Sequence, residues 1–351
     1  MSGGKNRLLD VLRALPAALV LLTGAAVIAA ERDEELALRL EAVVHVHAEV
    51  PPEARTAAYL GTTRDGSGVV IDNAGLIVTI GYLITEAMGA EITTADGKVS
   101  RADVVGVDLV SGLGLLRAAE ALPVKPMPIG TAQELAEKTP VVVAGSGGIE
   151  AAQPAVVVSR RAFAGYWEYL LDDAIFTAPP HPAWSGAALL APDGRLAGIG
   201  SLIVGDAKAR LPGNIFVPID HLRPVMGDLL ALGRPSTPPR PWLGVNVQEL
   251  DGKLVVGRLA LDGPGDRADI RRGDRVTALD GIPVHDLADF YRTLWRRGEA
   301  GITVRLSLAR QWEAQCRGQN HRPLPLSEAR DHLLNGSGQL RHPRVRGSTG
   351  F

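Results

Sequence analysis

The sequence of 351 residues is poor in cysteine, in aromatic residues and in net charge. Its one cysteine, Cys316, excludes an intrachain disulfide and a metal site built from several cysteines. Aromatic residues make up only 4 %, and the formal net charge is −2, so the charge balance gives no reason to expect a nucleic-acid partner. Nothing in the sequence implies a metal or an organic cofactor, and we expect no nucleic acid.

Apolar residues and glycine are abundant instead. Apolar residues make up 46 % of the chain, and there are 40 glycines. From Gly66 to about residue 219, short apolar runs alternate with turn residues, as in "SGVVID", "NAG", "LIVTI" and in "AEITTA", "DGK", "ADVVGVD". Strands of about five or six residues joined by such turns predict hairpins in an antiparallel barrel.

The N-terminus has the pattern of an export segment. Three basic residues precede the uncharged stretch 14–30, and the charged string "ERDEE" follows at once. This pattern is typical of a secretory signal cleaved near Ala29 or Ala30, or of an uncleaved anchor, since 17 residues is the short limit for a membrane span. Either alternative predicts an exported protein, periplasmic or otherwise extracytoplasmic.

The composition of the remaining sequence changes from a helix to a Pro-rich stretch, and it changes again after Arg310. Apolar residues at helical spacing predict a helix that Gly233 ends, and the following "RPSTPPRP" contains four prolines. After Arg310 the periodicity is lost, which raises the alternatives of a disordered tail, a differently closed module or a shifted reading frame. We expect five parts: a signal peptide or anchor at 1–30, a protease-fold domain at 31–233, a Pro-rich linker at 234–241, a PDZ-like domain at 242–310, and a disordered tail at 311–351.

Three strings carry a resemblance to a known family. They are "GSGVVIDNAGLIVTIGYLITEA" at 66–87, "DLVSGLGLLRA" at 108–118 and "HPAWSGAALLAPDGRLAGI" at 181–199. In this order they resemble the trypsin-like protease domain of the HtrA/DegP family, and "RADIRRGDRVTALDGIPV" at 267–284 resembles the PDZ domain that follows it. The resemblance implies a mainly β fold, with a two-lobed antiparallel trypsin-like double β-barrel followed by an α/β PDZ-like domain.

The strings depart from the family at the catalytic residues. The resemblance assigns Ser185 to the nucleophile, but it places Tyr82 where the family has histidine and Gly112 where it has aspartate. A tyrosine of ordinary pKa near 10 is a poor base at neutral pH, and glycine cannot orient a base. Ala183 replaces an oxyanion-hole glycine, so it would be strained, or its peptide would flip, if the loop needs a positive φ.

No other residue replaces the missing base. His181 lies only four residues before Ser185 in an extended loop, where it is poorly placed for the serine oxygen. We therefore expect a catalytically impaired pseudoprotease, and the alternative is an active serine endopeptidase in which Ser185 uses a non-standard base. Trp184, beside the serine, would either fill the cleft or line a peptide groove.

The PDZ-like part keeps its binding residues. PDZ domains add a peptide as a strand and hold its terminal carboxylate with backbone N–H groups. By resemblance, "WLGV" is the carboxylate loop and the helix at 287–295 forms the opposite wall. The peptide-binding residues this implies are Trp242, Leu243, Gly244, Val245, Phe290 and Leu294, although the apolar ones could equally be only core. The expected partners are unfolded or C-terminal peptides of client proteins in envelope quality control, and the resemblance implies a homotrimer.

Overall fold

The computed structural model describes residues 34–205, 212–310 and 340–341. The predicted signal peptide or anchor at 1–30 lies outside these residues, as does the tail except for its two-residue strand. Within the described part of the chain, every helix is too short or too polar to cross a bilayer.

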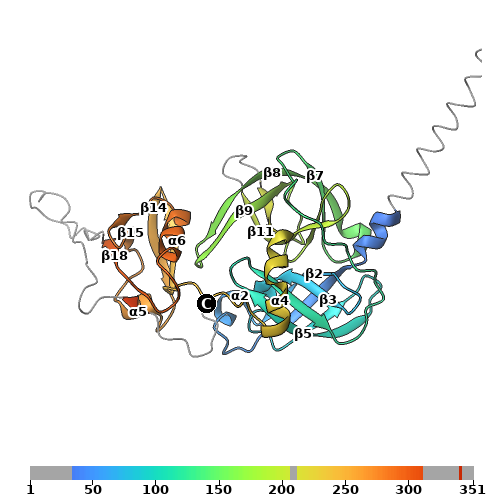
Figure 1. Ribbon diagram of the computed structural model, residues 1–351, viewed down its shortest axis with the longest axis horizontal. Coiled ribbons are helices and arrows are strands. Elements are labelled where there is room, and N and C mark those ends of the chain that lie inside the picture. Colours follow the sequence, from blue (N-terminus) through green and yellow to red (C-terminus); the bar gives the residue numbers. More distant parts are fainter. Residues whose placement is uncertain (1–33, 206–211, 311–339, 342–351) are drawn as a thin grey trace, which may run out of the picture. The chain divides into compact units, whose positions relative to one another are not determined.

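The first half of the chain forms a closed antiparallel barrel (Figure 1). Its strands follow the order β1-β2-β3-β6-β5-β4 around the barrel. Their bounds are β1 Val43–Glu49, β2 Thr63–Val70, β3 Leu76–Ile80, β4 Ala90–Thr93, β5 Val99–Asp108 and β6 Leu113–Ala118. The predicted turns are present: Gly75 and Gly97 adopt φ of 74° and 85°, which an L side chain rarely does. β3 is buried along its whole length, so its continuous apolar run forms barrel core.

A second closed barrel follows, with the strand order β10-β11-β12-β9-β8-β7. Its bounds are β7 Pro140–Ala144, β8 Ala152–Gly165, β9 Tyr169–Ala178, β10 Ala188–Leu190, β11 Leu196–Gly205 and β12 Pro212–Pro218. β8, with 14 residues, is the longest strand of this barrel, and it forms a hairpin with the neighbouring strand β9.

Helices are few and short in this part. They are a helix at 34–40, α2 Ala57–Leu60, α3 Gly81–Ile84, the 3-10 turns η1 Gly148–Ala151 and η2 Ile219–His221, and α4 Leu222–Leu232. The predicted helix end is confirmed, because α4 ends at Leu232 and Gly233 adopts a φ of 72°.

The C-terminal module is a small sheet covered by a helix. Its sheet has the order β13-β14-β15-β16, and β18 also pairs with β15. The elements are β13 Val245–Leu250, β14 Lys253–Leu259, α5 Pro264–Arg267, β15 Arg275–Leu279, β16 Ile282–Pro283, α6 Leu287–Trp295, β17 Thr303–Val304 and β18 Leu306–Ala309. The predicted helix at 287–295 is confirmed, and Asp286 caps it by accepting a hydrogen bond from the Asp289 N–H. Two tail residues form β19, Leu340–Arg341, which pairs with β17.

These elements confirm the expected fold class, a mainly β chain with a double antiparallel barrel and a following α/β module. Contacts divide the described residues into two compact units. The first contains residues up to 107 together with 112–159 and 175–230. The second contains 108–111, 160–174 and the chain from 231 onward. The end of the β8–β9 hairpin, residues 160–174, thus belongs to the unit of the C-terminal module; we call this segment the hairpin tip.

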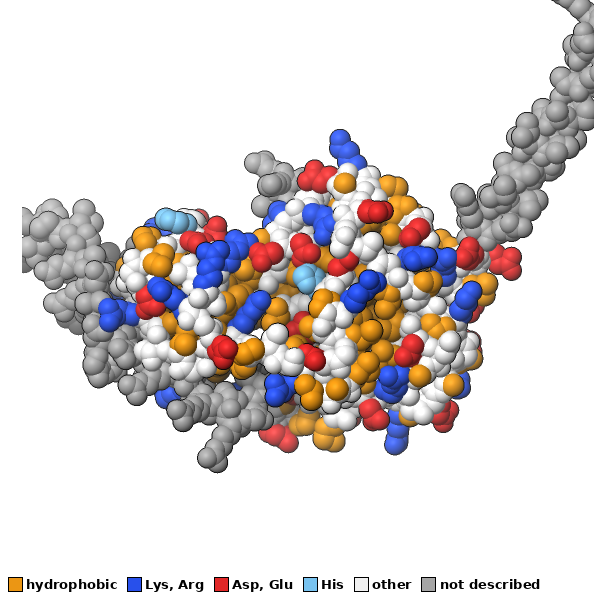
Figure 2. Space-filling model, viewed as in Figure 1, with side chains coloured by type: hydrophobic (Ala, Val, Ile, Leu, Met, Phe, Trp, Pro, Cys, Tyr) orange, Lys and Arg blue, Asp and Glu red, His pale blue; other side chains and the backbone are white. Residues whose placement is uncertain are grey.

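The described surface is mixed in charge. On the face shown in Figure 2, basic and acidic side chains alternate, and neither sign dominates the described residues of that face.

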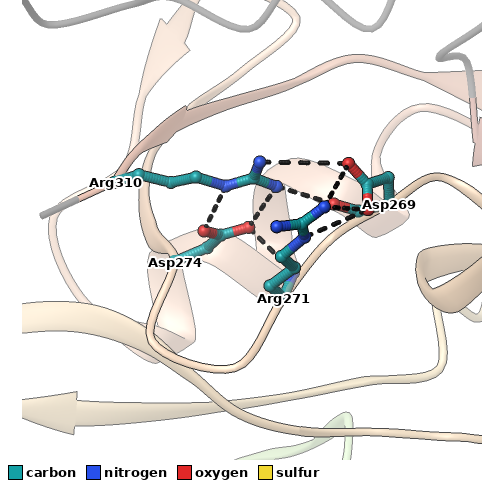
Figure 3. A network of polar contacts seen from close by, with 4 residues as sticks. All are labelled: Asp269, Arg271, Asp274 and Arg310. Atoms are coloured by element: carbon teal, nitrogen blue, oxygen red, sulfur yellow. Dashed lines mark hydrogen bonds and ion pairs between the residues drawn. The ribbon is translucent and has the colours of Figure 1, made fainter. Parts of the chain in front are cut away.

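A buried carboxylate anchors the last strand of the module (Figure 3). Asp274 is only 2 % exposed and accepts hydrogen bonds from the Arg310 Nε at 2.7 Å and the Arg271 backbone N–H at 2.8 Å. The same Arg310 guanidinium donates to the Asp269 carbonyl at 2.6 Å. Arg310, after which the composition changes, is therefore an integral part of the module.

We expect Asp274→Ala to destabilise the module by about 2 kcal/mol, because it leaves the Arg310 guanidinium and a backbone N–H without their acceptor. Arg271→Ala is the matched control, since its side chain pairs with Asp269 at the surface, where such pairs contribute about 0–1 kcal/mol. Urea titration followed by hydrogen exchange of peptides from 242–310 measures both changes. Equal effects of the two substitutions would contradict the assigned role of Asp274.

Candidate functional site

Ser185 lies in the loop between β9 and β10, and that loop is held against β2 of the first barrel. The Ser67 N–H donates to the Ser185 carbonyl at 2.8 Å. Gly186, with φ of 73°, approaches the Ser67 carbonyl so closely that a Cβ at this position would lie 1.9 Å from its oxygen. The glycine after the serine is therefore required by the packing of the loop, whatever the serine does.

Tyr82, on α3, lies directly beside the serine. Its phenol oxygen is 2.8 Å from Ser185 Oγ and 2.8 Å from the backbone carbonyl of Ser201. A carbonyl can only accept, so the arrangement that satisfies all three groups has Tyr82 donating to Ser201 and Ser185 donating to Tyr82. The Tyr82 oxygen thus accepts a hydrogen bond from the Ser185 hydroxyl, and the Tyr82 hydroxyl donates its own hydrogen bond to the Ser201 carbonyl.

This geometry does not supply a general base. Burial raises the pKa of Tyr82 well above its ordinary value of 10, against the opposing effect of the Ser185 hydrogen bond. The phenol is therefore neutral at physiological pH, and a neutral phenol cannot take the proton that serine must lose on attack.

Gly112 has a left-handed backbone conformation, which residues with a side chain rarely adopt. Its φ is 82°, and its carbonyl accepts a hydrogen bond from the Gly81 N–H at 2.6 Å, next to Tyr82 in the chain. The position is thus close to α3, but the conformation is one that glycine adopts without strain and an aspartate would not.

The backbone conformation of Ala183 distinguishes between the two predicted alternatives, a strained residue and a flipped peptide. It is absent from the seven non-glycine residues with positive φ in the described chain, so it is not strained. Its N–H instead donates to His181 Nδ1 at 3.1 Å. His181 is 5 % exposed, and its Nε2 lies 3.1 Å from the Ala151 carbonyl, which requires the proton on Nε2 and leaves Nδ1 as an acceptor. Burial lowers the pKa of His181, which keeps the ring neutral in this role.

The donor that the resemblance assigns to the oxyanion hole is therefore engaged by a neighbouring side chain. His181 is itself fixed by Asn214, which accepts from the His181 N–H at 2.6 Å and donates to its carbonyl at 3.2 Å. His181 hence acts on the loop conformation, and the expectation that it is poorly placed for the serine oxygen agrees with the partners that its ring has.

The second predicted site, the loop Trp242–Val245, already holds a carboxylate. Glu168, in the hairpin tip, accepts hydrogen bonds from the Leu243 N–H at 2.9 Å and the Val245 N–H at 3.0 Å. The Gly244 N–H adds a third backbone contact, and Gly244 adopts a φ of 70°. Burial raises the pKa of Glu168 to about 7, although the three N–H groups act in the opposite direction.

The predicted pocket side chains lie together in one apolar cluster. Leu243, Val245, Phe290 and Leu294 are each 0 % exposed there, and Leu170 of the hairpin tip belongs to the same cluster. The structure thus brings these residues from the loop and α6 into one core, and Leu170 of the hairpin tip is part of that core.

Sequence reasoning missed two participants. Ser201 contributes only its carbonyl, which any residue has, so no sequence signal marks it. Glu168 lies 75 residues before Leu243, and the string "YWEYL" around it looks like an ordinary strand turn.

Comparison with known proteins agrees with this architecture. The family model described as a trypsin-like peptidase domain matches residues 66–199, and the PDZ domain model matches residues 241–316. HhoA of Synechocystis sp., which is named as a serine protease, is 30 % identical over 288 residues, covering 74 % of this chain and 69 % of HhoA.

Two further proteins are more distant. A DegP-like protein of Pseudomonas fulva, named as a periplasmic serine endoprotease, is 26 % identical over 261 residues, covering 68 % of this chain and 53 % of that protein. A solved structure described as the HtrA-type protease AlgW with decapeptide is 19 % identical, with a TM-score of 0.48, covering 78 % of this chain and 93 % of that one.

The match to HhoA extends over more than two thirds of that protein, and the two domain models follow one another in the expected order. The chain therefore belongs to the HtrA/DegP family of trypsin-like serine proteases with a PDZ domain.

Proposed function

We propose that this chain is a pseudoprotease that binds unfolded or C-terminal peptides without cleaving them, in protein quality control of the cell envelope. The observation that carries the proposal is the contact of Ser185 with Tyr82 in place of an imidazole. A second observation supports it, because the Ala183 N–H is engaged by His181 and does not point to a developing oxyanion. Nucleophile activation and charge stabilisation are both impaired.

Peptide binding rests on the C-terminal module. β13 pairs with β14 on one side only within the described residues, so its other edge is available for an added strand. At the start of that strand, three successive N–H groups converge on a carboxylate. This combination of a free strand edge and a carboxylate loop is suited to a peptide C-terminus.

The setting of this function is also a proposal. The export-type pattern at 1–30 and the periplasmic naming of the Pseudomonas fulva relative support an extracytoplasmic location, with residues 14–30 either cleaved or retained as an anchor. Membership of the HtrA/DegP family supports a homotrimer, in which several modules would bind one unfolded client with increased avidity.

The alternative function is an active endopeptidase in which Tyr82 serves as the base. The 2.8 Å contact with Ser185 favours it, since a base must lie within hydrogen-bond reach. It requires a tyrosinate, however, and the raised pKa of Tyr82 opposes that state at neutral pH.

We expect labelled casein to be degraded at the same background rate by the wild type and by Ser185→Ala, because no group takes the serine proton. Cleavage by the wild type that Ser185→Ala abolishes would overturn the pseudoprotease proposal.

Restoring the family residues tests which parts are missing. We expect Tyr82→His with Gly112→Asp to gain only weak activity, because φ at 112 strains an aspartate and the Ala183 N–H stays with His181. Adding Ala183→Gly lets that peptide rotate, and one recovered oxyanion donor is worth about 10²-fold in rate. Casein degradation by the double and triple variants measures the difference. Equal rates would show that Ala183 does not limit the site.

Tyr82→Phe distinguishes a structural role of the Tyr82 hydroxyl from a role as the general base for Ser185. We expect no gain in fluorophosphonate labelling of Ser185 and a loss of about 1–3 kcal/mol in the free energy of unfolding, since the Ser201 carbonyl loses its donor. Tyr59→Phe, at a tyrosine that is 53 % exposed, is the matched control for the loss of a hydroxyl. If wild-type labelling is measurable and falls about 10²-fold in Tyr82→Phe, Tyr82 is the base.

A further inference from the structure

The hairpin tip contacts the carboxylate loop in the manner of a bound peptide end. Both oxygens of Glu168 are used, Oε2 by the Leu243 N–H and Oε1 by the Val245 N–H, with Gly244 between them. A side-chain carboxylate and a terminal α-carboxylate present the same two acceptor oxygens to such a loop.

The apolar half of a peptide end is represented as well. Leu170 lies two residues after Glu168, is 7 % exposed, and joins the cluster that contains Leu243, Phe290 and Leu294. A terminal peptide would likewise place its carboxylate in the loop and an apolar side chain in the pocket beneath it.

Contacts from α6 hold the tip in a conformation that would otherwise be unfavourable. Glu168 has a φ of 61°, which is uncommon for a residue other than glycine. Its N–H donates to the Tyr291 hydroxyl at 3.1 Å, and that hydroxyl donates to the Gly165 carbonyl at 2.8 Å. The buried Tyr291 thus bridges the two sides of the turn, and Arg292 pairs with Asp172 farther along the hairpin.

We infer that the hairpin tip is an intramolecular ligand of the carboxylate loop, in which Glu168 occupies the place of a peptide's terminal carboxylate. The partner that displaces it is a polypeptide with a free C-terminal carboxylate and an apolar last residue. The inference rests on the proposed peptide-binding function and adds that the site is occupied by the chain itself in the resting protein.

The rest of the groove is open to such a competitor. A cavity of about 680 Å³ lies between the hairpin tip and the C-terminal module. Gln248 and Leu250 of β13, Leu287 and Ala288 of α6, and Tyr166 of the hairpin tip line it. An incoming chain can therefore pair with the outer end of β13 before it competes with Glu168.

The test compares full-length wild type with Glu168→Ala, with Glu299→Ala as the matched control at an exposed glutamate of the same unit. Hydrogen exchange of the Leu243 and Val245 amides reports the internal contact directly. We expect exchange to be about tenfold faster or more in Glu168→Ala and unchanged in Glu299→Ala. Tyr291→Phe, which keeps the carboxylate and removes the bridge between Glu168 and Gly165, should give an intermediate increase.

The second arm uses a fluorescein-labelled decapeptide that ends in Ala-Leu-Val with a free carboxylate, and its C-terminal amide. If about a tenth of the wild-type molecules are undocked, Glu168→Ala should bind the free-acid peptide about tenfold more tightly, with no gain for the amide. Unchanged amide exchange in Glu168→Ala overturns the inference, and peptide binding by the wild type would then leave the proposed function standing. Faster exchange with no peptide bound by Glu168→Ala supports the internal contact and overturns peptide binding instead.

Discussion

The close approach of two backbone segments, at Ser67 and at Ser185 with Gly186, is the constraint on which the arrangement of the serine loop depends. The Ser67 N–H and carbonyl both face that loop, and Thr79 Oγ1 donates to the same carbonyl at 2.7 Å. Nothing in this contact requires catalysis. The contact uses the backbone of Ser185 and the missing side chain of Gly186, so the pattern "SG" is poor evidence of activity by itself.

The substitutions around the serine form a consistent set rather than separate losses. Tyr82 of α3 forms hydrogen bonds with the Ser185 hydroxyl and the Ser201 carbonyl, so the Ser185 hydroxyl has a partner. Gly112 has a backbone conformation suited to glycine, and His181 stabilises the peptide of Ala183. The Tyr82 hydroxyl, the Ser185 hydroxyl and the Ala183 N–H thus each have a hydrogen-bond partner within the chain.

The sequence predicted those parts of the structure that local chemistry determines. Turn residues such as Gly75 and Gly97 located the hairpins, and Gly233 located the end of α4, because a positive φ has few alternatives to glycine. The resemblance to the HtrA/DegP family also led to Tyr82 and Ser185, whose hydroxyl oxygens lie 2.8 Å apart. The orientation of the Ala183 N–H was not predictable, since it depends on a histidine that Asn214 fixes from 33 residues away. The partner of the carboxylate loop was missed for the same reason of distance along the chain.

The edge position of β13 has a consequence for solubility. An unpaired strand edge offers backbone N–H and C=O groups to any other extended chain, and natural proteins cover or interrupt such edges to avoid aggregation. Here the hairpin tip lines one cavity together with Gln248, Glu249 and Leu250 of β13, so an incoming strand meets a partly covered edge. The hairpin tip would thus limit indiscriminate pairing of β13 with exposed strands of misfolded proteins.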